Sequence, residues 1–272
     1  MGVRGLYSSL KAYAIPIKPE EELSLRIGID SYALLYKYKE QFDDLFAYVR
    51  LLQAGKHSVL FVLDGVPPPE KQEELALRKA QRKEAAQQAK ALREFLQDSS
   101  AQELAFEAKE LIQKKIQQYD NESWAVYKEL RDTFVRYAFE KGYPVHFSKG
   151  EADADLVAMA QNNEIDVILA NDMDYFVAGV ERLWIVNKEF PEPREFRHSA
   201  ISRAMSILPS AWKDIAILAG YEKTAHLRRV PISSAISLLR FYGSFERLFC
   251  KRPDLLGDQP LEEFLTARRF FE

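Results

Sequence analysis

The chain of 272 residues has a single cysteine, Cys250, and only four histidines, which are scattered along it. One cysteine excludes an internal disulfide and any zinc cluster built from several thiolates. No apolar run approaches the roughly 18 consecutive residues of a membrane-spanning helix, and the N-terminus has no secretory signal pattern. These absences predict an intracellular protein, nuclear or cytoplasmic, that has no membrane partner.

The chain has no excess of positive charge, because its formal net charge is −3 at pH 7. This balance argues against binding nucleic acid through overall charge. Between Lys71 and Arg93, however, seven basic residues stand against three acidic ones, so any phosphate-binding surface is local. The length and the hydrophobic content of 47% fit one large α/β domain with a small appendage.

Glycine and proline are absent from residues 70–139, which are rich in strong helix formers. With candidate turns at 98–100 and 120–123, the latter starting a new helix, this stretch predicts three helices. The first two are only moderately apolar and are expected to project from the core. A second helical pattern, from residue 201 to residue 272, predicts a small all-α C-terminal subdomain.

Short apolar runs, typical of buried strands, recur through the rest of the chain. They lie at 26–30, 58–63, 143–147, 166–170 and 183–186, and the residues from 190 to 196 are expected to form a loop. Carboxylates stand at the end of each of the first four runs. In an open α/β sheet, ligands bind at the carboxyl ends of the strands. The sequence therefore predicts an acidic site at that edge.

Five of the carboxylates in residues 148–177 form two groups. They are Glu151, Asp153 and Asp155, followed by Asp172 and Asp174. Taken singly, the first group fits the acidic first turn of a helix and the second fits a polar turn. Together with Asp30 and Asp64, however, they would repel one another unless cations bound between them. Hard oxygen ligands of this kind select Mg²⁺ or Mn²⁺.

Five segments, in this order, resemble the flap endonuclease/XPG family of structure-specific nucleases. They are MGVRGL, IGIDSYALLY, VLFVLDGVPPPEKQEELALRKAQRKEA, GEADADLVAMA and ILANDMDYF, and the resemblance extends to about residue 250. It implies a PIN-like α/β fold, with a mostly parallel central sheet, helices on both faces, and a helical arch inserted at about 70–139. The nuclease core would span residues 1–200, and residues 201–272 would form a helical nucleic-acid-binding subdomain.

The resemblance also implies roles for individual residues. The expected metal ligands are Asp30, Asp64, Glu151 and Asp153 for a first ion, Asp172 and Asp174 for a second, and Glu222 in the place of the family's seventh carboxylate. The expected catalytic residues are Lys71 and Arg78, which would contact the scissile phosphate. The expected nucleic-acid contacts are Gly2, Tyr36, Arg82, Lys83, Arg228 and Arg229. Asp155 matches no ligand of the family.

Two departures from the family occur near the C-terminus. The segment HLRRVPISSA, at 226–235, stands where the family has a glycine-rich hairpin that binds duplex backbone. The sliding-clamp motif is degenerate, since Leu261 and Phe264 fit it whereas Asp258 and Leu265 do not. A sliding clamp is therefore not an expected partner.

The resulting functional prediction is a monomeric, metal-dependent phosphodiesterase. It would cleave DNA at 5′ flaps or single-strand/duplex junctions with two Mg²⁺ ions, which Mn²⁺ can replace. Two alternatives within enzymes are a mainly 5′→3′ exonuclease and an RNA-cleaving relative. A third alternative is a catalytically silent scaffold of the same fold that binds nucleic acid. Six carboxylates at the expected positions favour an active enzyme.

Overall fold

The computed structural model divides into two compact units. The larger comprises Met1–Gly65 and Phe134–Glu272, and the smaller comprises Val66–Thr133. The structure describes residues 3, 5–67, 71–98, 105–186, 192–221, 224, 226–255 and 257–271, apart from the side chain of Glu73. The boundary expected near residue 200 stays a prediction.

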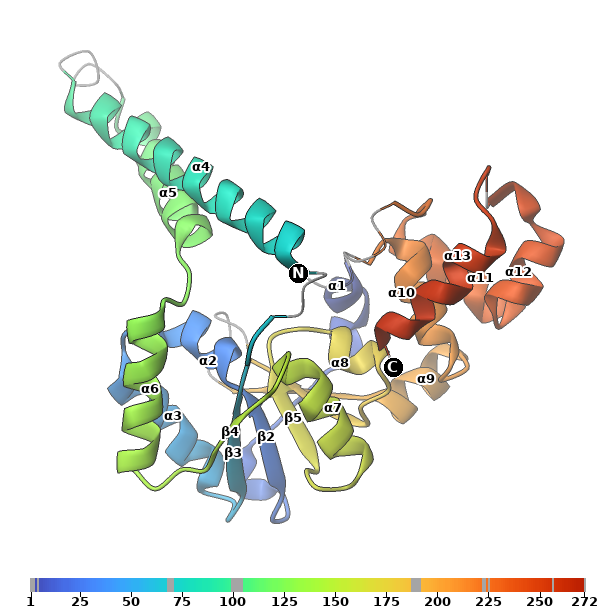
Figure 1. Ribbon diagram of the computed structural model, residues 1–272, viewed down its shortest axis with the longest axis horizontal. Coiled ribbons are helices and arrows are strands. Elements are labelled where there is room, and N and C mark those ends of the chain that lie inside the picture. Colours follow the sequence, from blue (N-terminus) through green and yellow to red (C-terminus); the bar gives the residue numbers. More distant parts are fainter. Residues whose placement is uncertain are drawn as a thin grey trace. The chain divides into compact units, whose positions relative to one another are not determined.

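A mixed sheet forms the centre of the larger unit (Figure 1), and its strand order is β1-β7-β6-β5-β2-β3-β4. The strands are β1 (Ile15–Pro16), β2 (Arg26–Asp30), β3 (Ser58–Leu63), β4 (Val145–Phe147), β5 (Val167–Ala170), β6 (Arg182–Ile185) and β7 (Arg194–Arg197). Strands β4, β3, β2, β5 and β6 are parallel to one another, whereas β7 pairs antiparallel with β6 and β1. The prediction of a mostly parallel α/β sheet is confirmed.

The helices fill the connections between strands and the C-terminal part of the chain. They are α1 (Leu6–Leu10), α2 (Ser31–Tyr38), α3 (Phe42–Gln53), α4 (Gln72–Gln97), α5 (Phe106–Ser123), α6 (Lys128–Glu140), α7 (Ala152–Gln161), α8 (Asp174–Val177), α9 (His198–Met205), α10 (Ala211–Ala219), α11 (Ile232–Tyr242), α12 (Phe245–Lys251) and α13 (Leu261–Ala267). None of the helices in the described part of the chain is long and apolar enough to cross a membrane.

Helices cover both faces of the sheet because successive side chains of a strand point to opposite sides. On one face, Phe61 of β3 makes edge contacts with Phe46 of α3 and Phe134 of α6, at ring separations of 6.1 and 5.1 Å. The next residue, Val62, points to the other face and belongs to a different buried cluster, which includes Leu156 of α7. Burial on both faces explains why the strands read as continuous apolar runs.

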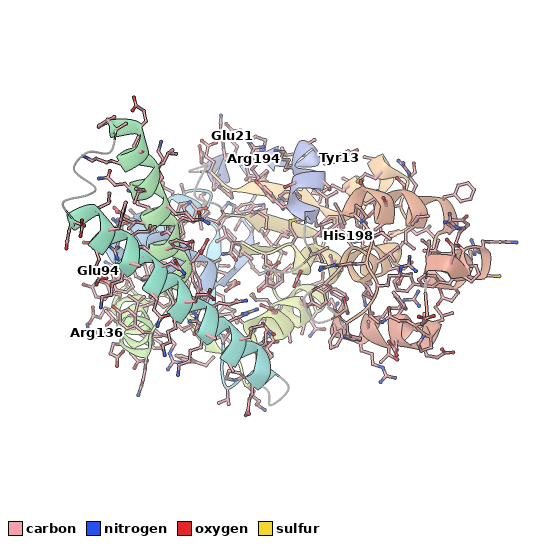
Figure 2. The ribbon with its side chains drawn as sticks, turned by 90° about the horizontal axis from the view of Figure 1, so that it is seen from above. Tyr13, Glu21, Glu94, Arg136, Arg194 and His198 are labelled. Atoms are coloured by element: carbon pink, nitrogen blue, oxygen red, sulfur yellow. The ribbon has the colours of Figure 1, made fainter. Side chains whose placement is uncertain are left out.

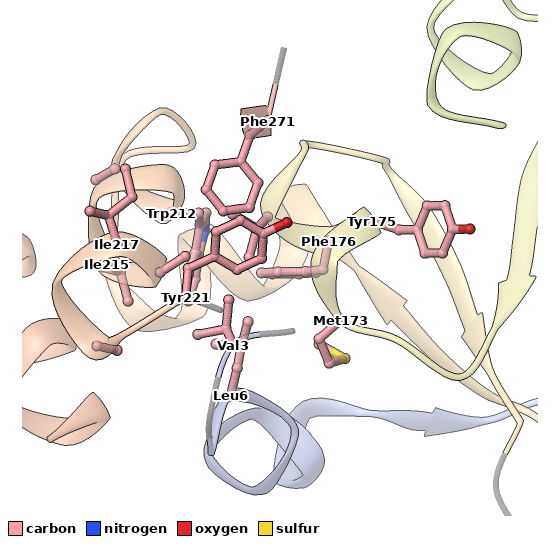
Figure 3. Close-up of a cluster of buried hydrophobic side chains, with 14 of the residues drawn as sticks. Val3, Leu6, Met173, Tyr175, Phe176, Trp212, Ile215, Ile217, Tyr221 and Phe271 are labelled. Atoms are coloured by element: carbon pink, nitrogen blue, oxygen red, sulfur yellow. The ribbon is translucent and has the colours of Figure 1, made fainter. Parts of the chain in front are cut away.

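The cluster on the second face continues into the C-terminal helices. Phe176 of α8 packs edge-on against Trp212 of α10 at 5.0 Å. Figure 3 shows these rings together with Val3 and Leu6 from the N-terminal segment. The C-terminal helices therefore share one apolar core with the sheet.

The smaller unit consists mainly of α4 and α5, which lie side by side (Figures 1 and 2). Ala85 and Ala89 of α4 and Ile116 of α5 are buried, and Arg93 pairs with Asp120 across the two helices. With α6, these are the three helices expected in residues 70–139. The turn expected at 120–123 instead forms the last turn of α5, and the next helix begins at Lys128.

The loop expected at 190–196 is partly wrong, because Arg194–Arg197 forms strand β7. Its second residue, Glu195, is buried and accepts hydrogen bonds from Arg182 and from the Trp184 ring at 2.6 and 3.1 Å. This buried acid interrupts the apolar pattern by which the other strands were identified. Arg194 of β7 pairs with Pro16 of the edge strand β1, and Figure 2 labels it near Glu21 and Tyr13.

Candidate metal centre

The first carboxylate of the site is placed by the junction between a strand and a helix. Asp30 ends β2 and caps α2, and its Oδ1 accepts a hydrogen bond of 3.0 Å from the backbone N–H of Tyr32. This is the ordinary N-cap arrangement, in which a side-chain oxygen satisfies one of the first N–H groups of a helix. In the neighbouring strand β3, Val62 pairs with Asp30. Asp64 thus follows at the same edge of the sheet.

Asp64 is brought to the start of α7 by a close backbone approach at Gly65. The N–H of Gly65 donates to the carbonyl of Gly150 at 2.7 Å, and a Cβ at Gly65 would lie 1.9 Å from the carbonyl oxygen of Ser148. Only glycine allows such an approach without moving the loop. Oδ1 of Asp64 then accepts a hydrogen bond of 2.8 Å from the N–H of Ala152.

The carboxylates after β4 and β5 complete the group. Glu151 immediately precedes α7, and Asp153 lies in its first turn. Asp153 Oδ1 accepts a hydrogen bond of 2.9 Å from the hydroxyl of Tyr175, whose oxygen is also 3.5 Å from Oδ2 of Asp30. In the turn after β5, Oδ1 of Asp172 accepts from the N–H of Asp174 at 3.1 Å.

The electrostatics of the site show how close these groups are. The pKa of Asp30 is raised to about 8, first by burial and then by the carboxylates of Asp153 and Asp64. Burial also raises the pKa of Asp153, and Asp64, Glu151 and Asp172 add to that rise. Among the described residues, no lysine or arginine is a main cause of either shift. The structure therefore brings together five of the predicted ligands from separate segments.

The chemistry of this donor set fits a hard divalent cation, since carboxylate oxygens are the protein ligands that Mg²⁺ prefers. A bound cation would also relieve the repulsion that the raised pKa values of Asp30 and Asp153 report. As the side chains stand, no three histidine, cysteine, aspartate or glutamate residues in the described ranges are grouped closely enough to hold a metal ion. Binding thus requires the carboxylates to close in on the ion.

Asp155 is hydrogen-bonded to a histidine. Its Oδ2 lies 2.7 Å from Nε2 of His146, and this hydrogen bond lowers the pKa of Asp155. The contact ties α7 to β4, the strand that precedes it. Nothing in the sequence pattern indicated this role for His146.

The basic residues expected to be catalytic lie in the smaller unit, at the N-terminal end of α4. Lys71 is the residue before this helix, and Arg78 pairs with Glu74 one turn away. Arg82 donates from Nε to the carbonyl of Arg78 at 3.2 Å, and Lys83 is exposed. In the larger unit, Tyr36 is 38% exposed on α2. Gly2 and Glu222 lie outside the described residues.

The two arginines of the segment at 226–235 make intramolecular contacts. Arg228 donates from Nη1 to the carbonyl of Asp254 at 2.9 Å, and its backbone N–H donates to Gln259 at 2.6 Å. The side chain of Arg229 lies against Gly220, where a Cβ would meet its Cδ at 2.9 Å. Of the clamp-motif residues, Phe264 is fully buried. The clamp expectation itself stays a prediction.

Tyr175 is the residue of the site that the sequence did not reveal. In the short helix α8, the side chain of Tyr175 extends away from Phe176 and Trp212, with its hydroxyl outermost (Figure 3). A tyrosine beside a carboxylate in DMDYF was the available signal, but an aromatic residue in an apolar run is more often part of a core.

Residues 142–222, which include Glu151, Asp153, Asp172 and Asp174, match the XPG I-region. Flap endonuclease 1-B of Oryza sativa subsp. indica is 26% identical over 204 residues, which cover 74% of this chain and 46% of the relative. Over these regions the chain is similar to members of the XPG/flap endonuclease family. It spans about half the length of this curated relative.

Solved structures of XPG/flap endonuclease nucleases show the same fold. The catalytic core of Rad2 in complex with a DNA substrate superposes with a TM-score of 0.64 at 18% identity, covering 99% of this chain and 79% of that one. The Holliday junction-resolving enzyme GEN1, in complex with product DNA and Mg²⁺, gives a TM-score of 0.59 at 16% identity, with coverages of 99% and 64%. The PIN-like α/β prediction is thereby confirmed.

Proposed function

We propose that the chain is a divalent-metal-dependent nuclease that cleaves DNA at 5′ flaps or at junctions between single strand and duplex. The observation that carries the proposal is the convergence of carboxylates at the carboxyl edge of the sheet, where no described arginine or lysine is a main influence on the pKa of Asp30 or Asp153. Charges that a fold removes from water are normally paired with an opposite charge or bind a metal. Acids placed like Asp30 and Asp153 are therefore suited to binding a cation from solution.

The ligand set divides between two ions, Mg²⁺ or, in its place, Mn²⁺. Asp30, Asp64, Glu151 and Asp153 would hold the first ion, and Asp172 and Asp174 the second, with Glu222 as a further ligand. When bound, such ions lower the pKa of water and stabilise charge on the attacking and leaving oxygens. The chain's own contribution is to hold these carboxylates by hydrogen bonds to Tyr32, Ala152, Tyr175 and Asp174.

The residues outside the carboxylate cluster would bind and orient the nucleic acid. Lys71 and Arg78 would contact the scissile phosphate, where fixed positive charge stabilises the transition state. Tyr36, exposed on the helix that Asp30 caps, offers a face for base stacking. The further nucleic-acid contacts in the proposal are Gly2, Arg82, Lys83, Arg228 and Arg229.

The decisive experiment compares end-labelled substrates of different structure. A 5′ flap, a nicked duplex, single-stranded DNA and single-stranded RNA are incubated with the full chain in Mg²⁺ or in EDTA, and the cut positions are mapped. Cutting at the flap junction in Mg²⁺ alone is the expected result. Cleavage from free 5′ ends would favour an exonuclease, and cleavage of RNA an RNA-specific relative. Binding without cleavage in either Mg²⁺ or Mn²⁺ would instead indicate a scaffold.

A further inference from the structure

Tyr175 is a buried tyrosine whose hydroxyl is turned into a group of carboxylates. The side chain is 2% exposed, and its ring extends from α8 away from the apolar cluster around Phe176 (Figure 3). The hydroxyl donates to Oδ1 of Asp153 at 2.9 Å and lies 3.5 Å from Oδ2 of Asp30. Since a hydroxyl carries one proton, the shorter contact is the hydrogen bond and the longer one is only a weak approach.

Three other carboxylates of the centre accept hydrogen bonds from the backbone. Oδ1 of Asp30 accepts from the N–H of Tyr32, Oδ1 of Asp64 from Ala152, and Oδ1 of Asp172 from Asp174. These donors are built into helix starts and turns, so no side-chain substitution removes them. For Asp153 the corresponding donor is a side chain, and replacing tyrosine by phenylalanine deletes it with little change in shape.

We propose that Tyr175 is a positioning residue that sets the metal selectivity of this centre, an inference that rests on the proposed metal-dependent function. Its hydroxyl engages Oδ1 of Asp153, so that this carboxylate presents its other oxygen to a cation and binds it through one atom. Ca²⁺ accepts carboxylates through both oxygens and takes six to eight ligands, whereas Mg²⁺ requires a compact octahedral set. The tyrosine therefore favours Mg²⁺ over Ca²⁺.

The position of the hydroxyl supports this role over simple packing. It lies between carboxylates from two different segments, Asp153 on α7 and Asp30 at the end of β2, and its hydrogen bond limits the rotation of Asp153. Without the hydroxyl, Asp153 gains an oxygen for coordination and becomes able to turn. A looser site with more available oxygens suits the larger ion.

The test is the Tyr175→Phe variant of the full chain, with metal affinity read from stability instead of activity. The unfolding midpoint is followed in EDTA and then in increasing MgCl₂ or CaCl₂, because a ligand that binds the folded state raises it in proportion to its affinity. We expect the ratio of the Ca²⁺ to the Mg²⁺ dissociation constant to fall about tenfold in the variant, within the range found for residues that orient metal ligands. In cleavage assays, kcat should fall while the KM for nucleic acid is unchanged.

The matched control is Tyr48→Phe, which deletes another buried phenol hydroxyl. Tyr48 lies on α3, and its hydroxyl has no hydrogen-bond partner among the described residues. This variant should leave both metal titrations as in the wild type. An equal change in the two variants would mean that loss of a buried hydroxyl, and not the contact with Asp153, alters metal binding.

The outcomes separate the inference from the function on which it rests. An unchanged Ca²⁺ to Mg²⁺ ratio in Tyr175→Phe, with both ions still stabilising the chain, overturns the selectivity role alone. A wild type stabilised more by Ca²⁺ than by Mg²⁺ also overturns it, even if the variant does not fold. If neither ion shifts the midpoint of the wild type, the metal-dependent function fails and the inference with it.

Discussion

Acids lie in two different environments in the larger unit, and their hydrogen-bond donors differ. In the C-terminal helices, the buried Asp214 of α10 receives two hydrogen bonds from Arg268, at 2.6 and 2.7 Å. At the carboxyl edge of the sheet, Asp30 and Asp153 are less buried, and their donors are backbone N–H groups and the hydroxyl of Tyr175. Asp214 is thus paired with a cation, whereas Asp30 and Asp153 have neutral donors among the described residues.

The pKa values follow this difference at Glu195 but not at Asp214, where burial raises the pKa although the hydrogen bond from Arg268 lowers it. Glu195, a second acid paired with arginine, would have its pKa raised by burial, yet Arg197, Trp184 and Arg182 hold it below its usual range. The pKa of Asp30 is raised to about 8, first by burial and then by the neighbouring acids. An acid whose pKa is lowered by an arginine therefore contributes to the fold, whereas Asp30 and Asp153, whose pKa values are raised, destabilise it until a cation binds. Each of the following experiments tests this contrast.

The largest effect is expected from removing an acid of the metal centre. Asp64→Ala and Asp174→Ala should each slow cleavage by more than about a hundredfold, because about a hundredfold is the upper range for residues that merely orient metal ligands. The unfolding midpoint of each variant in EDTA should stay close to that of the wild type. Single-turnover cleavage of a labelled flap at saturating Mg²⁺ measures this. The control is Asp43→Ala, an exposed acid on α3. Wild-type cleavage rates in both variants would mean that neither carboxylate is needed for cleavage.

Removing an acid that is paired with an arginine should lower the stability of the protein and leave cleavage nearly unchanged. In Asp214→Asn, Arg268 loses the buried one of its two carboxylate partners and keeps Glu246, so the cost should be at most the roughly 3–5 kcal/mol typical of breaking a buried ion pair. Urea unfolding measures the loss, and cleavage per folded molecule should be nearly unchanged. Asp254→Asn is the matched control, since it breaks the exposed pair with Arg252. A loss of cleavage without a loss of stability would contradict the structural role of Asp214.

The same comparison between a structural and a catalytic role can be made for the basic residues at the start of α4. Arg78 is paired with Glu74 on one helix, so Arg78→Ala should change stability by less than about 1 kcal/mol. If Arg78 contacts the scissile phosphate, its loss, like that of Lys71, should slow cleavage by about a hundredfold or more. Single-turnover rates and substrate binding are measured side by side, with Lys109→Ala on α5 as the control. Unchanged cleavage in both Lys71→Ala and Arg78→Ala would remove them from the active site.

The contrast also predicts a substitution in the metal centre that stabilises the protein. Asp30→Asn removes a charge that is disfavoured by burial and by the neighbouring acids Asp153 and Asp64. In EDTA the variant should gain at least about 1.4 kcal/mol, the equivalent of one pKa unit, and in Mg²⁺ the gain should shrink or reverse. Urea unfolding in the two conditions tests this. A variant that is less stable than the wild type in EDTA would show that Asp30 is needed for the fold.

Much of this arrangement could be predicted from the sequence, because parallel strands buried on both faces leave continuous apolar runs. The strands ending at Asp30 and Leu63 were identified in this way, and so was the acidic edge that follows them. Strand β7 was missed because Glu195 is buried through ion pairs, which no hydrophobic pattern records. Residues 120–123 looked like a turn because of their polar side chains, but they form the exposed last turn of α5.

Contacts between distant side chains could not be predicted. No role was predicted for Gly65, yet its lack of a side chain is what lets Asp64 reach the start of α7. The hydroxyl of Tyr175 and the contact between His146 and Asp155 depend on how α7 and α8 meet the sheet. Arg228 was expected to bind nucleic acid, and the fold shows that it also bonds the carbonyl of Asp254.

The smallest effect is expected at the rim of the arginine-paired region, where Glu246 meets Arg268 at 2.7 Å. The hydrogen bond from Arg268 lowers the pKa of Glu246 from 4.5 to about 2. Because the pKa is lower in the folded state than in the unfolded state, the contribution to stability is complete above pH 4.5 and is lost as the pH falls through about 2. Glu246→Gln should therefore cost about 0.5 kcal/mol at pH 7, a typical value for a half-exposed pair. The difference from the wild type should vanish near pH 2, whereas Glu262→Gln, an exposed acid on α13, should show no such change. A difference that persisted at low pH would mean that Glu246 contributes through packing, and the arginine pairing would then be confined to Asp214.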